Sequence, residues 1–200
     1  MISDIFKPAV VRLISPTARG LLRIGLTPNS VTTIGAIGVI ATSLIAYPSG
    51  HLFGGTIAIC CLALSDLFDG TMARISKAGS SLWGGFLDST IDRVTDSAIT
   101  IAVIVPLIAA DDPLSYLGLA TLVTGFLTPY IRAKAESFGI ECSVGIAERT
   151  ERLIIILTAV GFHGLGVPYI LAIGLWLLAI LGVITVFQRM AVVRRGLTAR

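Results

Sequence analysis

The stretch Asp66–Asp92, DLFDGTMARISKAGSSLWGGFLDSTID, brings four carboxylates into an otherwise apolar chain. Asp66 and Asp69 are three residues apart, and Asp88 and Asp92 are four residues apart. At these spacings each pair lies on one face of its own helix. Four acids held together at the edge of a membrane repel one another, and they stay ionised only when divalent cations lie between them. The stretch therefore predicts two acidic helices that hold a metal site.

Composition places these helices in a membrane. Of the 200 residues, 54% are hydrophobic and only 14% are charged, whereas a soluble domain carries about 25% charged residues. No Asp, Glu, Lys or Arg occurs in 24–65 or in 153–188, and each run is long enough for two spans of about 20 residues. The charge-poor stretches 97–110 and 113–131 supply two more. We therefore expect an all-α, polytopic membrane protein with six transmembrane helices, the second of which runs from about Leu52 to Arg74.

The distribution of charge predicts how these helices are oriented. Turns at 48–50, 111–113 and 164–166 place three short loops on one side of the membrane. All 15 Lys and Arg residues then lie on the other side, with both termini and ten of the twelve acids. The side rich in Lys and Arg is the cytoplasm by the positive-inside rule. We expect a multi-pass protein of the cell membrane whose active site and termini face the cytoplasm.

The N-terminal segment has a different pattern from the spans. Its apolar residues, from Ile2 to Ile14, share one stripe of a helical wheel, so 1–25 is predicted to contain an amphipathic helix in the membrane interface. The basic residues of the chain lie in short segments beside spans, which favours membrane lipids and not nucleic acid as their partner. No internal repeat or domain boundary is visible, so 1–200 is expected to form a single transmembrane domain.

The aspartates have two alternative explanations. They could be solvated helix caps, but caps do not need two pairs at one-turn spacing. Acidic residues close to the membrane interior are also rare and usually serve a function. They could also bind the transported ion of a cation transporter or channel. Against a transporter, the acids cluster toward the cytoplasmic ends of helices, and no second acidic site lines a path outward. The metal-site hypothesis is the stronger one.

Eight residues in this stretch stand at set spacings: Asp66, Asp69, Gly70, Ala73, Arg74, Gly84, Asp88 and Asp92. The pattern resembles the signature of the CDP-alcohol phosphotransferases, integral membrane enzymes of phospholipid synthesis. The likeness runs the length of the chain and looks closest to the actinobacterial phosphatidylinositol phosphate synthases. The spacer of nine residues between Arg74 and Gly84 is one residue longer than in many members, which leaves the register of Ser80 and Ser81 open.

The resemblance implies that the phosphatidyl group of CDP-diacylglycerol moves to an alcohol and that CMP is released. It implies that Asp66, Asp69, Asp88 and Asp92 bind the metal, and that Asp92 also acts as general base on the acceptor hydroxyl. All-oxygen ligation suits Mg2+, with Mn2+ as the alternative, and we expect two ions. Such ions would screen the acidic site from the donor pyrophosphate. The resemblance to the family also implies that the protein forms a homodimer.

The donor site implied by the resemblance combines the first span with the acidic stretch: Asn29, Thr32, Gly70, Ala73, Arg74, Ser81 and Gly84. Arg74 would steady the donor phosphates, and Ser81, or Ser80 in the other register, would contact the same ligand. The small residues would let the nucleotide approach the backbone. Each feature also has a structural explanation, because 27–32 can simply open a helix with polar caps and the glycines can serve helix packing.

The acceptor site is expected among basic residues on the cytoplasmic side of the membrane, where the metal site is also predicted: Lys134, Arg152, Arg132, Arg149 and Arg189. Guanidinium groups bind phosphate in bidentate fashion, so these residues suit a phosphorylated acceptor. The alternative is a set of ion pairs at helix ends. The overall likeness, including YIRAKAE and ERTERL, points to myo-inositol 1-phosphate, with phosphatidylinositol phosphate as product. Glycerol 3-phosphate, which would give phosphatidylglycerol phosphate, is the alternative acceptor.

Overall fold

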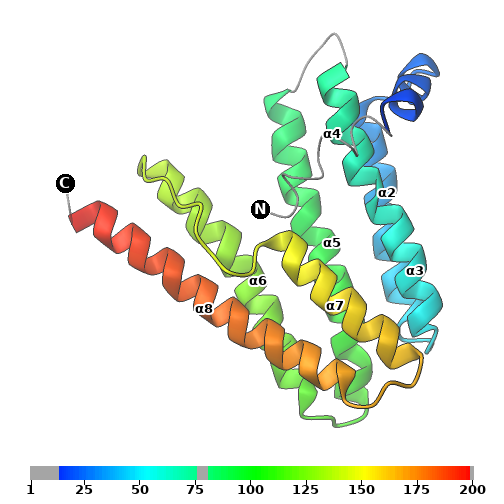
Figure 1. Ribbon diagram of the computed structural model, residues 1–200, viewed down its shortest axis with the longest axis vertical. Coiled ribbons are helices and arrows are strands. Elements are labelled where there is room, and N and C mark those ends of the chain that lie inside the picture. Colours follow the sequence, from blue (N-terminus) through cyan, green and yellow to red (C-terminus); the bar gives the residue numbers. More distant parts are fainter. Residues whose placement is uncertain (1–13, 76–80, 199–200) are drawn as a thin grey trace. The chain divides into compact units, whose positions relative to one another are not determined.

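The computed structural model describes residues 14–75 and 81–198, except for the side chains of Asp66, Leu67 and Asp69. Residues 14–23 are helical and seven further helices follow: α2 (Pro28–Ala46), α3 (Leu52–Ala63), α4 (Ser65–Ile75), α5 (Leu82–Ala109), α6 (Leu114–Ser137), α7 (Arg149–Gly164) and α8 (Ile170–Thr198) (Figure 1). The described ranges contain no strand, so the prediction of an all-α fold is confirmed. Most of the expected interfacial stripe falls in 1–13, outside the described residues.

Local sequence explains where the helices begin and end. The hydroxyl of Thr27 accepts a hydrogen bond from the Ser30 N–H at 3.2 Å, so Thr27 caps α2 just before the proline at its first position. In the same way, the Asp112 carboxylate accepts from the Leu114 N–H at 2.9 Å where α6 begins. The turns expected at 48–50 and 111–113 fall between helices, and the third begins at Leu165, one residue later than expected, because α7 extends to Gly164.

The second predicted span differs from expectation. We expected one helix from about Leu52 to Arg74, but a turn at Leu64 separates α3 from α4. The new helix begins with Ser65 and Asp66, residue types that favour helix starts, because their side chains can bond to first-turn N–H groups and an acid is stabilised there by the helix dipole.

Three of the described helices are long and apolar enough to cross a membrane, namely α2, α6 and α8. Large apolar side chains are exposed along them, as expected of surfaces that meet lipid: Ile34, Ile37, Phe126, Trp176 and Phe187. The structure therefore contains three candidate membrane spans among its described helices, and the number of six spans stays a prediction.

Contacts divide the chain into two compact units. The first comprises 1–42 and 57–95, and the second comprises 43–56 and 96–200. In the first unit, α2 packs closely against the α3–α4 junction because Gly35 and Gly38 lack side chains. A Cβ at Gly35 would collide with the Ser65 hydroxyl, and one at Gly38 would stand 2.9 Å from a Leu62 methyl group. This close approach fixes the start of the acidic helix α4.

In the second unit, α8 packs along both α6 and α7 (Figure 1). Small residues allow this packing at two points. Gly182 of α8 faces Thr124 of α6, and Gly174 faces Ala159 of α7, each so closely that an added Cβ would collide. Close backbone approach through small residues is the usual way in which helices associate in membranes. The three helices form the frame that carries the predicted cationic site.

Candidate active site and metal centre

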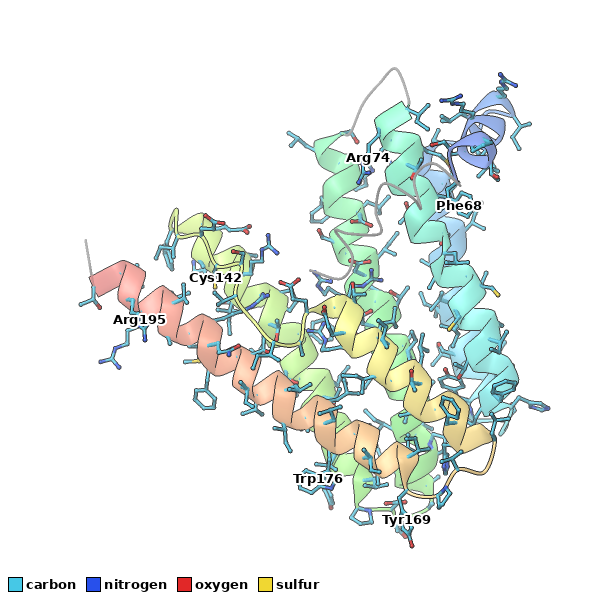
Figure 2. The ribbon with its side chains drawn as sticks, in the orientation of Figure 1. Phe68, Arg74, Cys142, Tyr169, Trp176 and Arg195 are labelled. Atoms are coloured by element: carbon cyan, nitrogen blue, oxygen red, sulfur yellow. The ribbon has the colours of Figure 1, made fainter. Side chains whose placement is uncertain are left out.

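The two predicted pairs of aspartates lie on two helices, as the spacing indicated. Asp66 and Asp69 belong to α4, and Asp88 and Asp92 belong to α5. Arg74 lies in the last turn of α4 and is exposed (Figure 2). The side chains of the first pair are outside the described part of the structure, so the convergence of the four carboxylates stays a prediction.

Asp92 stands in an environment that suits a bound cation. Its side chain is only 14% exposed, and its Oδ2 lies 3.6 Å from Nη1 of Arg93. Asp88, one turn earlier on the same helix, is half-buried. Carboxylates removed from water require compensating positive charge, and oxygen donors one helical turn apart suit Mg2+ or Mn2+. Among the described side chains no group of three or more possible metal ligands is gathered, and the side chains of Asp66 and Asp69, half of the predicted set, lie outside the described part.

Three predicted donor-site residues come together at the start of α5. The Gly84 N–H donates to the Ser81 hydroxyl at 2.9 Å, so Ser81 caps the helix. A Cβ at Gly84 would stand 3.1 Å from Oδ1 of Asn29 and 3.0 Å from Oγ of Ser81. A larger residue here would require both polar side chains to shift by a few tenths of an ångström. Ser80, the alternative to Ser81, lies outside the described residues.

The other predicted donor residues have different surroundings. Thr32 is buried and donates to the Pro28 carbonyl of its own helix at 3.0 Å. Ala73 and Gly70 are half-buried on α4. Apart from its chain neighbours and the backbone of its own helix, no described atom lies within 4 Å of the position that a Cβ would take at Gly70. Gly70 therefore differs from Gly84, because the described neighbours do not explain it by packing.

Two of the predicted acceptor-site cations meet at one carboxylate. Nε of Arg149 lies 3.3 Å from Oδ1 of Asp96, and Nη2 of Arg152 lies 3.6 Å from Oδ2. The Arg152 side chain is only 10% exposed, so this guanidinium is held inside the second unit. Asp96 follows Asp92 by one turn on α5. The arrangement gathers two guanidinium groups at one point of the unit.

Arg189 of α8 is bound almost entirely by protein. Its side chain is 4% exposed, Nη1 donates to the Thr128 carbonyl at 2.6 Å, and Nε donates to the Val144 carbonyl at 2.8 Å. Nη2 lies 3.9 Å from Glu148. These contacts tie α8 to α6 and to the loop that precedes α7. They give Arg189 a structural role, whereas its predicted contact with an acceptor is not tested.

The same loop is docked on α8 by further bonds. Cys142 is buried and its thiol donates to the Arg189 carbonyl at 3.9 Å (Figure 2). The Ala147 N–H donates to the Thr185 hydroxyl at 3.2 Å. Gly145 has a φ of +147° and stands so close to Thr185 that a Cβ would lie 2.6 Å from its methyl group. A glycine is therefore needed where the loop crosses α8.

Lys134 and Arg132 are exposed near the C-terminal end of α6. Nε of Arg132 lies 2.9 Å from Glu136 one turn later, which is the helix-end ion pair considered as an alternative. Nζ of Lys134 stands 4.6 Å from the centre of the Phe138 ring. These two residues therefore lack the buried setting that Arg152 has.

Asp96 is the residue that sequence reasoning missed, since it was given no role. A usable signal exists, because Asp96 is the last charged residue before the uncharged stretch 97–110 of α5. An acid that borders an apolar membrane helix implies a partner of opposite charge. The partners themselves are 53 or more positions away, and local spacing does not reveal such a pairing.

Comparison with known proteins gives a consistent result. The sequence pattern of the family described as CDP-alcohol phosphatidyltransferase matches residues 25–187. Phosphatidylinositol phosphate synthase of Streptomyces avermitilis is 40% identical over 204 residues, which cover 98% of this chain and 83% of the relative. The enzyme of that name from Cutibacterium acnes is 41% identical over 202 residues, which cover 96% and 97%.

Solved structures resemble this fold closely. The crystal structure of Mycobacterium tuberculosis phosphatidylinositol phosphate synthase with CDP-DAG bound superposes with a TM-score of 0.86 at 40% identity, and the match covers 91% of this chain and 94% of that one. The structure of the same protein with manganese and citrate gives a TM-score of 0.85 at 40% identity, covering 90% and 88%. Both the fold and the motif therefore agree with one group of membrane enzymes.

Proposed function

Because the chain belongs to the CDP-alcohol phosphatidyltransferase family, we propose that it transfers the phosphatidyl group of CDP-diacylglycerol to myo-inositol 1-phosphate, forming phosphatidylinositol phosphate and CMP. The observation that carries the assignment of a phosphorylated acceptor is the pair Arg149 and Arg152, held together at Asp96. Two guanidinium groups suit a phosphate on the acceptor. Relatives about 40% identical over most of the chain carry the name phosphatidylinositol phosphate synthase.

The reaction needs a divalent metal ion, in keeping with the manganese in the related structure. Asp66, Asp69, Asp88 and Asp92 would hold two ions, which we propose to be Mg2+, with Mn2+ as a substitute. When bound, the ions offset the charge of the donor pyrophosphate and of the leaving phosphate. The described pair Asp88 and Asp92 fits this use, because both carboxylates are at least partly removed from water on one helix.

Asp92 is proposed to act as the general base. A carboxylate oxygen takes the proton of the acceptor hydroxyl as its oxygen bonds to the phosphorus of the phosphatidyl group. The bond from that phosphorus to the bridging oxygen of the pyrophosphate breaks, and the oxygen leaves with CMP. Proton removal by a positioned side chain contributes typically about 100-fold to 10,000-fold to the rate. Asp92 suits this task because its side chain is mostly buried.

The donor is proposed to bind along the start of α5 and on α4. Asn29, Ser81 and Gly84 lie together in the first unit, and Gly84 keeps the backbone accessible beside the two polar side chains. Gly70 and Ala73 would let the nucleotide approach α4, and Arg74 would contact its phosphates. Thr32 would contribute through its place one turn after Pro28 on α2, beside Asn29.

The acceptor phosphate is proposed to bind to cations of α6, α7 and α8. Arg149 and Arg152 form the centre of this site, with Lys134 and Arg132 at its exposed side. Arg189 would contribute mainly by holding the loop before α7 in place, since its donors bond to the Thr128 and Val144 carbonyls.

The chain is a membrane protein, and its finer arrangement belongs to this proposal. We place it in the cell membrane as a single transmembrane domain with six spans, with the active site and both termini in the cytoplasm. Segment 1–25 would lie in the membrane interface, and the protein would act as a homodimer. The distribution of Lys and Arg supports the cytoplasmic placement of the active site and the termini.

The choice of acceptor has a direct test. Purified protein is given CDP-diacylglycerol and Mg2+ with either inositol 1-phosphate or glycerol 3-phosphate, and CMP release is measured. We expect release with inositol 1-phosphate. Release with glycerol 3-phosphate alone would contradict the assignment and favour phosphatidylglycerol phosphate synthesis. Metal-dependent CMP release also separates the enzyme from the cation transporter considered above, because a transporter releases none.

A further inference from the structure

The Asp96 carboxylate lies beside two arginines at the start of α7. Arg149 and Arg152 both lie in the first turn of α7, where the helix dipole disfavours positive charge. Glu148 stands at the N-cap position but makes no capping bond with its side chain, and its carboxylate lies 3.9 Å from Arg189 instead. The carboxylate that contacts both arginines comes from α5 and belongs to Asp96.

The geometry of these contacts constrains both guanidinium groups. Oδ1 of Asp96 lies 3.3 Å from Nε of Arg149, and Oδ2 lies 3.6 Å from Nη2 of Arg152. A guanidinium presents its N–H donors in a planar, fixed fork, so a carboxylate that holds one part of the group also sets the direction of the rest. Asp96 also offsets the repulsion between two cations that are held close together.

We propose that Asp96 is a positioning residue for the acceptor, because it holds Arg149 and Arg152 together so that their guanidinium groups bind the phosphate of inositol 1-phosphate. This inference rests on the proposed function, since it assumes that these arginines meet the acceptor. Asp96 follows Asp92 by one turn of α5. One helix therefore carries both the proposed base and the residue that orients the phosphate-binding groups.

The test uses the Asp96→Asn variant of the full-length protein in detergent with Mg2+. Binding of inositol 1-phosphate is measured by calorimetry, with a parallel titration of CDP-diacylglycerol. We expect acceptor affinity to fall at least about tenfold, the usual cost of losing a residue that orients a binding group, while donor affinity stays unchanged. The control is Glu151→Gln, which removes an exposed acid from the same turn of α7 and should bind both ligands as the unmodified protein does.

Several outcomes would overturn the inference. They are unchanged acceptor affinity in Asp96→Asn, an equal loss of both ligands, and an absence of acceptor binding in the unmodified protein. If Asp96→Asn cannot be obtained folded, Asp96→Glu replaces it, because it keeps the charge and moves it by one methylene. We then expect acceptor binding to weaken with donor binding intact, because the displaced carboxylate holds the guanidinium groups in a different position, and unmodified affinity would overturn the inference.

Turnover is measured separately so that the two proposals can fail separately. The unmodified protein is assayed for CMP release from CDP-diacylglycerol with inositol 1-phosphate. Acceptor binding without CMP release would refute the proposed function and leave the positioning role of Asp96 standing. CMP release by the unmodified protein, together with full acceptor affinity in Asp96→Asn, would support the proposed function and refute the positioning role of Asp96.

Discussion

Arg189 of α8 donates a hydrogen bond to the Thr128 carbonyl of α6 at 2.6 Å, across 61 positions of the chain. The same guanidinium bonds to the Val144 carbonyl of the loop before α7. One buried side chain therefore joins two packed helices and the segment that leads to the proposed acceptor site. Its charge is offset by Glu148 and by carbonyl dipoles, which makes it costly to remove.

We expect Arg189→Ala to lower the free energy of unfolding by about 3 kcal/mol, because it removes a buried guanidinium together with its bonds to the Thr128 and Val144 carbonyls and its contact with Glu148. The measurement is denaturant unfolding of the purified protein in detergent. The control is Arg194→Ala, which removes an exposed arginine from the same helix and should change stability little. Equal stability of the two variants would show that the Arg189 contacts contribute nothing.

Asp92→Asn should abolish CMP release, with a fall of at least about 100-fold, because an amide cannot accept the proton of the acceptor hydroxyl. CDP-lipid binding should stay measurable. The control is Asp111→Asn, which alters an exposed acid in a turn with a φ of 52°, a conformation that asparagine also tolerates. Near-normal turnover in Asp92→Asn would remove Asp92 as the base.

Gly84→Ala should raise the KM for CDP-diacylglycerol several-fold, because a Cβ at this position crowds Asn29 and Ser81. The matched control is Gly85→Ala, since no described atom lies within 4 Å of a Cβ there. The KM of each variant is measured by steady-state kinetics in which the concentration of CDP-diacylglycerol is varied. If both variants have the same KM, the polar pair beside Gly84 is not part of the donor site.

Arg152→Gln should raise the KM for the phosphorylated acceptor about tenfold or more while changing the KM for the CDP-lipid little. The reason is that a buried, charge-assisted contact to phosphate is lost. Lys134→Gln should act in the same direction with a smaller effect, because Lys134 is exposed. Arg195→Gln, another exposed site, is the control. An equal rise in both KM values would indicate a folding role.

Much of the fold could be predicted because the signals are local. Stretches without charge mark α2, α6 and α8, and Thr27 with Pro28 marks the start of α2. Asp88 and Asp92 share a helix, as their spacing of one turn required. The break at Leu64 was not predicted, because an apolar run of suitable length favours a continuous helix until Ser65 and Asp66 are recognised as a helix start.

The site was less predictable because its contacts are not local. The basic residues near the ends of α6 and α7 were identified from charge alone, and this did not distinguish exposed Arg132 from buried Arg152. Nor did it show that Arg189 would bond to backbone carbonyls. The pairing of Asp96 with Arg149 depends on how α5 and α7 pack, and sequence periodicity does not contain that packing.

The central claim is that a divalent metal at the aspartates enables transfer of the phosphatidyl group. Its most direct test is CMP release by the purified protein from CDP-diacylglycerol and inositol 1-phosphate, before and after chelation. We predict that release requires Mg2+, stops when EDTA removes the ion, and returns when excess Mg2+ or Mn2+ is added. Release that continues unchanged after complete removal of divalent metal would contradict the account.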